Sequence, residues 1–581
     1  MRKHVKGFVF SSLTLIALIA SVIGVTLTWA NSHSPLISRS SLATGARSAS
    51  AAQVAMYSVN MQSVPSEPAR PANHRSTALP LHTGTSAAVY AQRKAAAASN
   101  KHAPVGKQAY ANVKGAKTNT PGAITSFQGM SDSASTCPYF GGCEPPDQAL
   151  AASKSWIFQG VNTSFAIYSP SGVLQSGWPK SAQSFFHISS PGACDPNGPF
   201  LSDPRAFYDP NDGRFWAATL QVEGAFGLNS CPFATRYWIA VSQTSDPRGT
   251  WNIYAFDMSL GTTNVADYTQ FGFDAQAIYF TGNMFNQAGT AYKYAEIFGV
   301  NKSSLEHAHS ATAYGFFNLT VGGTPVDTVQ PVETEAHSYS GPFAGLFINS
   351  FNIDFGSGQC SRGCSGVTIW AMAKPGTASD SLTGRVLGTA NYTLAPSADQ
   401  PSCLHCIETL DTRISGTPVY HNGLISFALE TGVNNGSQVV PGILWGQVSP
   451  VLNDAGALVG ASLFQNAYYY YSGDGAASFG ALMPDADGNL FMLFEFSNNA
   501  SFPGVAYTAR RVTYSPGFFH DGGIYLRTGD ANTFDTRWGD FEATSYDGVS
   551  TDNVWFSGQY SNPSGDWSTF IGKDKFSLAT R

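Results

Sequence analysis

The residues best suited to chemistry are aspartates that recur at similar places along the chain. Each stands at the start of a short predicted strand, at Asp147, Asp203, Asp267, Asp411 and Asp540. If those strands surround a common axis, equivalent positions bring the carboxylates to one mouth of a channel. Carboxylates gathered in this way bind Ca²⁺, or act as an acid/base pair with separated pKa values. The alternative is that each carboxylate caps its own loop by accepting backbone N–H bonds.

One arginine precedes the last of these aspartates. Arg537 could hold an acidic group of a substrate, or form a salt bridge that locks the last repeat to the first. The candidate catalytic set is therefore Asp147, Asp203, Asp411 and Asp540 with Arg537, and the calcium candidates are Asp147, Asp203 and Asp540. We expect no other cofactor. Patterns such as G-x-S-x-G, H-E-x-x-H and a Walker loop are missing from the sequence.

The elements that must position these residues are short strands that repeat. Residues 203–257 predict four antiparallel strands, with the turn Pro210–Gly213 between the first two. The start of this unit recurs at similar spacing, at Asp147, Asp203, Asp267, Ser338, Asp411, Ser478 and Asp540. The pattern predicts an all-β, seven-bladed β-propeller over residues 123–581. The last unit shows three strands, and residues 123–127 could supply the fourth and so close the ring.

Eight cysteines lie beyond residue 122, which suits an oxidising compartment. Neighbour pairing predicts the disulfides Cys137–Cys143, Cys194–Cys231, Cys360–Cys364 and Cys403–Cys406. Cross-pairing of the last four cysteines remains open, because spacing alone does not fix connectivity. A zinc site made of those four thiolates is the alternative.

The N-terminus predicts export. Arg2, Lys3 and Lys6 precede an apolar stretch that ends near Ala30, so residues 1–30 are a cleaved signal peptide or a single uncleaved membrane anchor. Residues 31–122 are rich in Ala, Ser and Pro without sustained periodicity, and predict a disordered tether. The protein is then secreted or held at the cell surface.

Charge is distributed unevenly between the tether and the body. Residues 1–122 hold 13 Lys/Arg and one acid, Glu67, whereas residues 123–581 hold 19 Lys/Arg and 37 Asp/Glu. An acidic body with scattered positive charges argues against nucleic acid as a partner, since phosphate binding needs a basic patch. The same charge balance permits cations or cationic partners.

A resemblance to one family rests on several short motifs in the same order. They include Pro145-Pro146-Asp147, Ser202-Asp203-Pro204 and Arg537-Trp538-Gly539-Asp540-Phe541. The chain resembles large exported bacterial proteins that carry an RWGDY-type motif, with Phe541 here in place of the tyrosine. The resemblance implies a secreted, propeller-like body and no particular activity.

Two functions from different classes follow. The first is a non-catalytic secreted or cell-surface propeller, expected to be a monomer, that binds an extracellular polymer, glycan or partner protein. The second is an extracellular hydrolase or lyase of the glycoside-cleaving class, with carboxylates at the channel mouth. A deep pocket with two accessible carboxylates favours the second, and a plugged channel with exposed aromatic loops favours the first.

Overall fold

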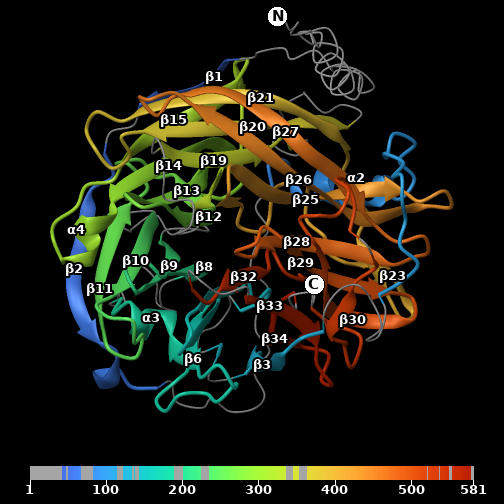
Figure 1. Cartoon of the computed structure of the whole chain (residues 1–581), viewed down its shortest axis with the longest axis horizontal. Coiled ribbons are helices and arrows are strands. Elements are labelled where there is room, and N and C mark those ends of the chain that lie inside the picture. The colour runs from blue at the N-terminus through green and yellow to red at the C-terminus, as the bar shows by residue number, and fades with distance from the viewer. Residues whose placement is uncertain are drawn as a thin grey trace, which may run out of the picture. The chain divides into compact units, whose positions relative to one another are not determined.

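The fold consists almost entirely of antiparallel strands. The computed structural model describes residues 42–47, 50–66, 83–113, 122–133, 136–137, 143–188, 200–223, 235–334, 344–352, 363–519, 521–535, 537–548 and 553–576. Strands account for 55% of the residues and helices for 5% (Figure 1). The signal or anchor predicted over residues 1–30 lies outside the described residues. Within them, no helix combines the length and apolarity needed to cross a membrane.

Most strands fall into groups in which consecutive strands pair with one another. Groups I and II are β4 (Ala149–Ala152), β5 (Ile157–Val161), β6 (Ser164–Tyr168) and β7 (Lys180–Ser181), then β8 (Phe200–Asp209), β9 (Arg214–Val222), β10 (Thr235–Ser242) and β11 (Thr250–Asp257). Groups III and IV are β12 (Val265–Phe273), β13 (Ala277–Phe285), β14 (Tyr292–Asn301) and β15 (Tyr314–Val321), then β17 (Gln330–Pro331), β19 (Ala344–Ser350), β20 (Cys364–Ala373) and β21 (Ser381–Tyr392).

The remaining groups continue in chain order. Groups V and VI are β24 (Val419–His421), β25 (Leu424–Asn434), β26 (Val439–Leu452) and β27 (Leu458–Tyr469), then β28 (Ala476–Pro484), β29 (Leu490–Asn498), β30 (Ser501–Arg510) and β31 (Ile524–Arg527). Group VII is β32 (Ala543–Tyr546), β33 (Val554–Ser561) and β34 (Trp567–Asp574), completed by β3 (Thr125–Ser131). Because β3 pairs with β34, the closing strand comes from the start of the body, as the sequence predicted.

The first strands of the groups form a closed cycle. β4 contacts β8, β8 contacts β12, and β12 contacts β17 and the short β18 (Glu333–Thr334), which pairs with β24. The cycle continues from β24 to β28, from β28 to β32, and from β32 back to β4. This arrangement is that of an all-β propeller, which confirms the predicted fold class.

The number of blades stays a prediction. Strand β1 (Leu42–Arg47) pairs with both β15 and β21, and so joins groups III and IV into one ten-stranded sheet. The predicted start of the fourth unit, Ser338, lies outside the described residues. The first strand of group IV is instead β17, which follows Asp327.

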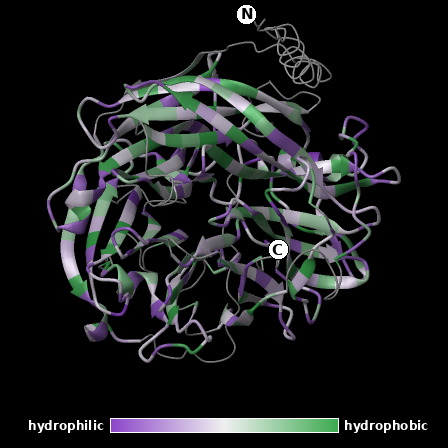
Figure 2. Ribbon diagram, viewed as in Figure 1, coloured by the Kyte–Doolittle hydropathy of each residue, from purple (hydrophilic) through white to green (hydrophobic). Residues whose placement is uncertain are grey.

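Apolar side chains between the groups make up the core. Figure 2 shows hydrophobic residues concentrated along the strands and hydrophilic residues in many of the connecting loops. Large aromatic side chains fill these layers, and Trp216, Trp251, Trp370, Trp445, Trp555 and Trp567 are fully buried. Burial of this much aromatic surface explains how a chain with few charges folds stably.

The described parts of the predicted tether, residues 42–47, 50–66 and 83–113, are packed against the body. β1 pairs with groups III and IV, β2 (Gln53–Asn60) pairs with β11, and α2 (Ala87–Ala97) contacts the segment after β23 through Tyr90 and Lys94. We call residues 42–66 and 83–113 the N-terminal arm. Its Lys94 side chain is buried, and Lys94 Nζ donates to the Leu410 carbonyl at 2.8 Å. Composition missed the arm because its order comes from hydrogen bonds to sheet edges of the body and not from a core of its own.

Candidate functional site

A residue with a left-handed backbone lies in the first strand of each group or in the segment that leads into it. These residues are Asp147, Asp203, Tyr268, Thr328, Leu410, Phe479 and Gly539, with φ between 45° and 60°. Asp and Gly tolerate this conformation better than most residues. In β8, β12 and β28 the strand register shifts at this residue, which marks a β-bulge. We call the face from which the first strands start the entry face.

Asp147, Asp540 and Arg537 come together, as the sequence predicted. The backbone N–H of Asp540 donates to Oδ1 of Asp147 at 3.0 Å, and the Arg537 guanidinium forms an ion pair with the Asp540 carboxylate. The Arg537 N–H donates to Oε1 of Glu144 at 3.0 Å. These contacts join group VII to the loop that leads into group I.

Asp203 joins the same cluster through a residue that the sequence did not single out. Asn162 Nδ2 donates to Oδ2 of Asp147 at 2.7 Å, and Oδ1 of Asn162 accepts from the Asp203 N–H at 2.8 Å. Oδ2 of Asp203 accepts from the Thr269 N–H at 2.7 Å. Each carboxylate thus accepts a backbone N–H from the first strand of a neighbouring group.

Asp411 has an arginine of its own. Arg413 Nε and Nη2 donate to the two oxygens of Asp411 at 2.7 and 2.6 Å, which is a bidentate pair. The Arg413 guanidinium also lies 4.3 Å from the centre of the Tyr268 ring, and the Tyr268 hydroxyl donates to the Asp540 carbonyl at 3.1 Å. The two-residue spacing in Asp411-Thr412-Arg413 is a sequence signal for this pair, although Arg413 was not among the predicted site residues.

Arg205 of β8 is the second residue that sequence reasoning missed. Its guanidinium carbon lies 3.3 Å from the centre of the Phe541 ring, and its Nη1 donates to the Thr417 hydroxyl at 3.5 Å. Its Nε and Nη2 have no hydrogen-bond partner among the described residues, although the side chain is only 4% exposed. Arg205 lies in group II and contacts residues just before the first strands of groups V and VII, so its side chain bridges three groups.

Asp327 before β17 is a further carboxylate that the repeat analysis did not find. Its pKa is raised to about 8, chiefly by burial and then by the charge of Asp411. The sequence signal was present, because Asp327-Thr328-Val329-Gln330 repeats the Asp-x-x-Gln pattern of Asp267-Tyr268-Thr269-Gln270.

Burial dominates the electrostatics of the cluster. Burial, and then the charges of Asp540 and Asp203, raise the pKa of Asp147 well above its usual value. Burial, and then the charge of Asp267, raise the pKa of Asp203 to about 7. Burial alone would also raise the pKa of Asp411, but Arg413 more than offsets it and the pKa is lowered.

The carboxylates of the predicted catalytic set are shielded from solvent. Asp147, Asp203 and Asp411 are 1–3% exposed and Asp540 is 8% exposed. Among the aspartates of the repeat, Asp267 differs, because it is half-buried. The side chains of Arg205, Arg413 and Tyr268 lie among these carboxylates and contact Phe541, Asp411 and Asp540.

Two of the predicted disulfides are present, Cys137–Cys143 and Cys403–Cys406. Cys364 is also disulfide-bonded, and Cys194, Cys231 and Cys360 lie outside the described residues. The alternative zinc site is therefore wrong, because Cys403 and Cys406 are oxidised and offer no thiolate.

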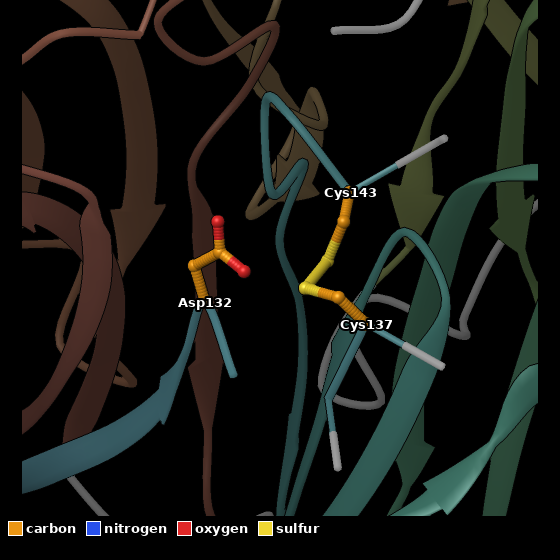
Figure 3. Close-up of side chains that lie close together, drawn as sticks. All are labelled: Asp132, Cys137 and Cys143. Carbon is orange, nitrogen blue, oxygen red and sulfur yellow. A yellow bond between two sulfur atoms is a disulfide. The ribbon is translucent and has the colours of Figure 1, made fainter. Parts of the chain in front are cut away.

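Within the described part of the chain, possible metal-ligand atoms lie close together at one place. Asp132 lies beside the sulfur atoms of Cys137 and Cys143 (Figure 3). A disulfide leaves these sulfurs unable to act as thiolate ligands, so this group does not fit a metal ion. This group does not include the calcium candidates Asp147, Asp203 and Asp540. Calcium binding stays a prediction.

Comparisons with known proteins give remote likenesses only. No protein-family model and no curated protein matches the chain. Among solved structures, the chain is similar to Trypanosoma rangeli sialidase (9% identity, TM-score 0.28, covering 73% of this chain and 57% of that one). It is also similar to Cellvibrio cellulosa alpha-L-arabinanase (9%, 0.27, 64% and 94%) and to Drosophila Semaphorin 1b, extracellular domains 1-2 (9%, 0.32, 80% and 87%). Identities and TM-scores this low identify neither a family nor an activity.

Proposed function

We propose that this chain is a non-catalytic propeller that binds an extracellular polymer or glycan through its entry face. The proposal rests on the burial and the hydrogen bonding of the predicted catalytic carboxylates. They are buried and already accept hydrogen bonds from backbone N–H groups or from arginines. A general acid or base must contact the substrate. These carboxylates are instead hydrogen-bonded to other groups of the protein.

Two exposed apolar side chains lie on segments that precede the site residues in the sequence. Leu404 is 67% exposed and Phe534 is 63% exposed. Leu404 lies in β23 (Cys403–Ile407), which ends just before Asp411, and Phe534 lies just before the Arg537–Asp540 turn. We propose these exposed apolar side chains as the binding surface, because apolar groups left in contact with water often mark interaction sites.

Hydrogen bonds hold the two loops together. The Thr533 N–H donates to Oε1 of Gln400 at 2.8 Å, and Gln400 Nε2 donates back to the Thr533 carbonyl at 3.1 Å. Asn532 Nδ2 donates to the Pro401 carbonyl at 2.7 Å. The Cys403–Cys406 disulfide further restrains the loop that carries Leu404. A pre-organised aromatic ring loses little conformational entropy when a sugar ring or polymer chain stacks on it.

Variants of these side chains test the proposal. The full chain is applied to a glycan array and to pull-downs with insoluble polysaccharides, together with Phe534→Ala and the double variant Leu404→Ser/Phe534→Ala. We expect binding to fall at least about tenfold in the double variant, as for the loss of a stacked aromatic hot spot. Phe464→Ala is the matched control, because Phe464 is 55% exposed on the outer strand β27. Equal binding by all variants, or no binding to any polymer, contradicts the proposal.

A glycoside hydrolase is the second candidate, and one observation favours it. The half-buried Asp267 raises the pKa of its buried neighbour Asp203, which would leave one carboxyl protonated beside one that reaches solvent. A panel of chromogenic glycosides tests this candidate. Turnover that Asp203→Asn and Asp267→Asn each abolish, while folding is retained, would establish it in place of the binding function.

A location outside the cytoplasm belongs to the same proposal. The disulfides Cys137–Cys143 and Cys403–Cys406 support an oxidising compartment. Export by residues 1–30, either as a cleaved signal or as an anchor, and a monomeric state remain part of the proposal. Fractionation of cells and N-terminal sequencing of the exported protein would decide between signal and anchor.

A further inference from the structure

The Cys403–Cys406 disulfide lies in a hairpin that is separate from the groups of the propeller. Strand β22 (Ala398–Gln400) and strand β23 form a two-stranded sheet of their own, in which Gln400 pairs with Cys403 across a two-residue turn. β22 contacts β29 and β30 of group VI without joining their sheet. The hairpin can therefore change its conformation without breaking the hydrogen bonds of a propeller group.

This disulfide is open to solvent. Cys403 and Cys406 are half-buried, and the residues beside them are exposed. Leu404 is 67% exposed, and the side chain of His405 is 53% exposed. Thiol–disulfide exchange requires that a thiolate can approach one of the two sulfurs. The position of Cys403–Cys406 meets this condition.

The Cys137–Cys143 disulfide has the opposite surroundings. Cys137 is 5% exposed and Cys143 is 1% exposed. A carboxylate oxygen of Asp132 lies within 4.8 Å of both sulfur atoms (Figure 3). An attacking thiolate is negatively charged, so this carboxylate repels it. Burial and like charge both protect Cys137–Cys143, which makes it an internal control for the exposed disulfide.

The backbone of the hairpin is strained next to both cysteines. Ser402 has φ of +64° and His405 has φ of +52°, in the left-handed region that L-residues disfavour. Hydrogen bonds hold His405 in place, because its N–H donates to Oδ1 of Asp399 at 2.7 Å and its Nδ1 donates to the Ser397 carbonyl at 3.1 Å. Opening the disulfide lets this backbone relax, so the strain favours the reduced form.

Gln400 is placed to assist one sulfur. The side-chain amide of Gln400 is fixed by two hydrogen bonds with the backbone of Thr533, at 2.8 and 3.1 Å. Its Nε2 also donates to Sγ of Cys406 at 3.5 Å. An N–H donor stabilises the negative charge that a sulfur gains when it leaves as a thiolate. The Cys403 carbonyl lies 3.4 Å from the same sulfur, so a Cys406 thiol has an acceptor as well.

We propose that Cys403–Cys406 is a redox-active disulfide that accepts two electrons from a dithiol. A thiolate of the dithiol attacks Sγ of Cys403 and forms a mixed disulfide. The bond to Cys406 breaks, and its electron pair stays on Sγ of Cys406, which takes up a proton.

The second thiolate of the dithiol completes the exchange. It attacks the dithiol's own sulfur in the mixed disulfide, and Cys403 leaves as a thiolate and takes up a proton. The products are two cysteine thiols and the oxidised dithiol, and the two protons that the cysteines gain are the two that the dithiol has lost.

This exchange goes beyond the proposed binding function and does not depend on it. Leu404 lies between the two cysteines, so reduction also removes the cross-link from the loop that carries part of the proposed binding surface. Exchange is measured by thiol labelling and needs no polymer. A failure to bind any polymer would therefore leave this proposal intact.

Differential thiol labelling of the full chain tests the proposal. The native protein is equilibrated with increasing ratios of reduced to oxidised dithiothreitol, and free thiols are blocked with iodoacetamide. The remaining disulfides are then reduced and labelled with N-ethylmaleimide, and mass spectrometry of the peptides measures each disulfide separately. We expect Cys403–Cys406 to be half reduced at a ratio at least about tenfold lower than Cys137–Cys143.

The selectively reduced protein should keep its native circular dichroism spectrum and should reoxidise when oxidised dithiothreitol is restored. Equal ratios for the two disulfides, or reduction that occurs only together with unfolding, overturns the proposal. Reduced thioredoxin replaces dithiothreitol in a second series at the same dithiol concentration. Faster reduction by thioredoxin would assign a protein as the source of electrons, and slower reduction would assign a small dithiol.

Gln400→Leu tests which sulfur leaves. Asn532→Ala is the matched control, because it removes the bond from Asn532 Nδ2 to the Pro401 carbonyl in the same pair of loops but does not touch a sulfur. Reduction of Cys403–Cys406 should be about fivefold slower in Gln400→Leu than in Asn532→Ala, which is the effect of one hydrogen bond. Equal rates in the two variants would overturn the assignment of Cys406 as the leaving sulfur.

Discussion

The Asp540 N–H donates to Oδ1 of Asp147 across 3.0 Å, and this bond joins the last group of strands to the first. Asp540 carries its own counter-charge, Arg537, into the same contact. The motif Arg537-Trp538-Gly539-Asp540-Phe541 thereby receives a structural explanation. Trp538 is buried, Gly539 supplies the left-handed residue, and Phe541 lies under the Arg205 guanidinium.

Arg537→Ala should destabilise the fold by about 3–5 kcal/mol, because it leaves Asp540 buried without its counter-charge. Urea unfolding of the full chain measures the loss. Arg527→Ala is the matched control, since Arg527 and Asp530 form an ion pair at the same spacing but are 32% and 27% exposed. The control should lose no more than about 1 kcal/mol. If calcium raises the melting temperature of wild type and Arg537→Ala costs nothing, a cation and not Arg537 compensates the carboxylates.

Asp411→Asn should destabilise the fold more at neutral pH than in acid. Arg413 lowers the pKa of Asp411 against the effect of burial, so the pair stabilises the fold above the ordinary pKa of 3.8 and loses this effect as pH falls below it. The variant should therefore be several kcal/mol less stable than wild type at pH 7, and the difference should narrow toward pH 2. Unfolding curves at the two pH values measure this, and a constant difference would contradict it.

A chain that starts at residue 123 should be less stable than the full chain. Removing the arm uncovers the edges of β11, β15 and β21, which β1 and β2 occupy in the structure. Exposed edges promote aggregation. A chain that starts at residue 41 keeps the arm and is the control, and both are compared by melting temperature and gel filtration. Equal behaviour of the two would mean that the arm contributes nothing.

Gly539→Ala should destabilise by more than its backbone conformation alone explains. Gly539 has φ of +60°, which costs an L-residue about 1–2 kcal/mol, and its Cβ would meet Glu495 Oε1 at 3.2 Å. Gly261→Ala is the control, because Gly261 has φ of +75° and nothing within 4 Å. The difference in unfolding free energy between the two variants isolates the contact with Glu495. Equal losses of unfolding free energy in the two variants would show that the Glu495 carboxyl moves away from the new Cβ at no cost.

Reduction of the two disulfides should destabilise the loops that they close. Cys137–Cys143 and Cys403–Cys406 close loops with sequence separations of 6 and 3, for which chain entropy gives about 2 kcal/mol each. Titration of the denatured, unreduced protein should find these four thiols blocked. Cys403→Ser/Cys406→Ser should also reduce binding by the Leu404–Phe534 surface, which a purely remote disulfide would leave unchanged.

The repeat of turns and aromatic strands was enough to predict the all-β propeller and the closing role of residues 123–127. The convergence of Asp147, Asp203 and Asp540 was also predictable, because all three begin first strands. Asn162 and Arg205 were not, because they belong to no motif and contact residues far away in sequence. The order of the arm was hidden for a related reason, since Lys94 and Tyr57 find their partners in other parts of the fold.

The pairing of β3 with β34 has a consequence for how the chain reaches its native state. The Thr569 hydroxyl donates to the Met130 carbonyl over a sequence separation of 439. A nascent chain cannot form this ladder until its last strand has been synthesised, and closing so long a loop is slow. During that interval the early strand presents an open edge, which is prone to wrong pairing. We therefore expect the yield of native protein to depend on the rate of synthesis and on chaperones more than on equilibrium stability.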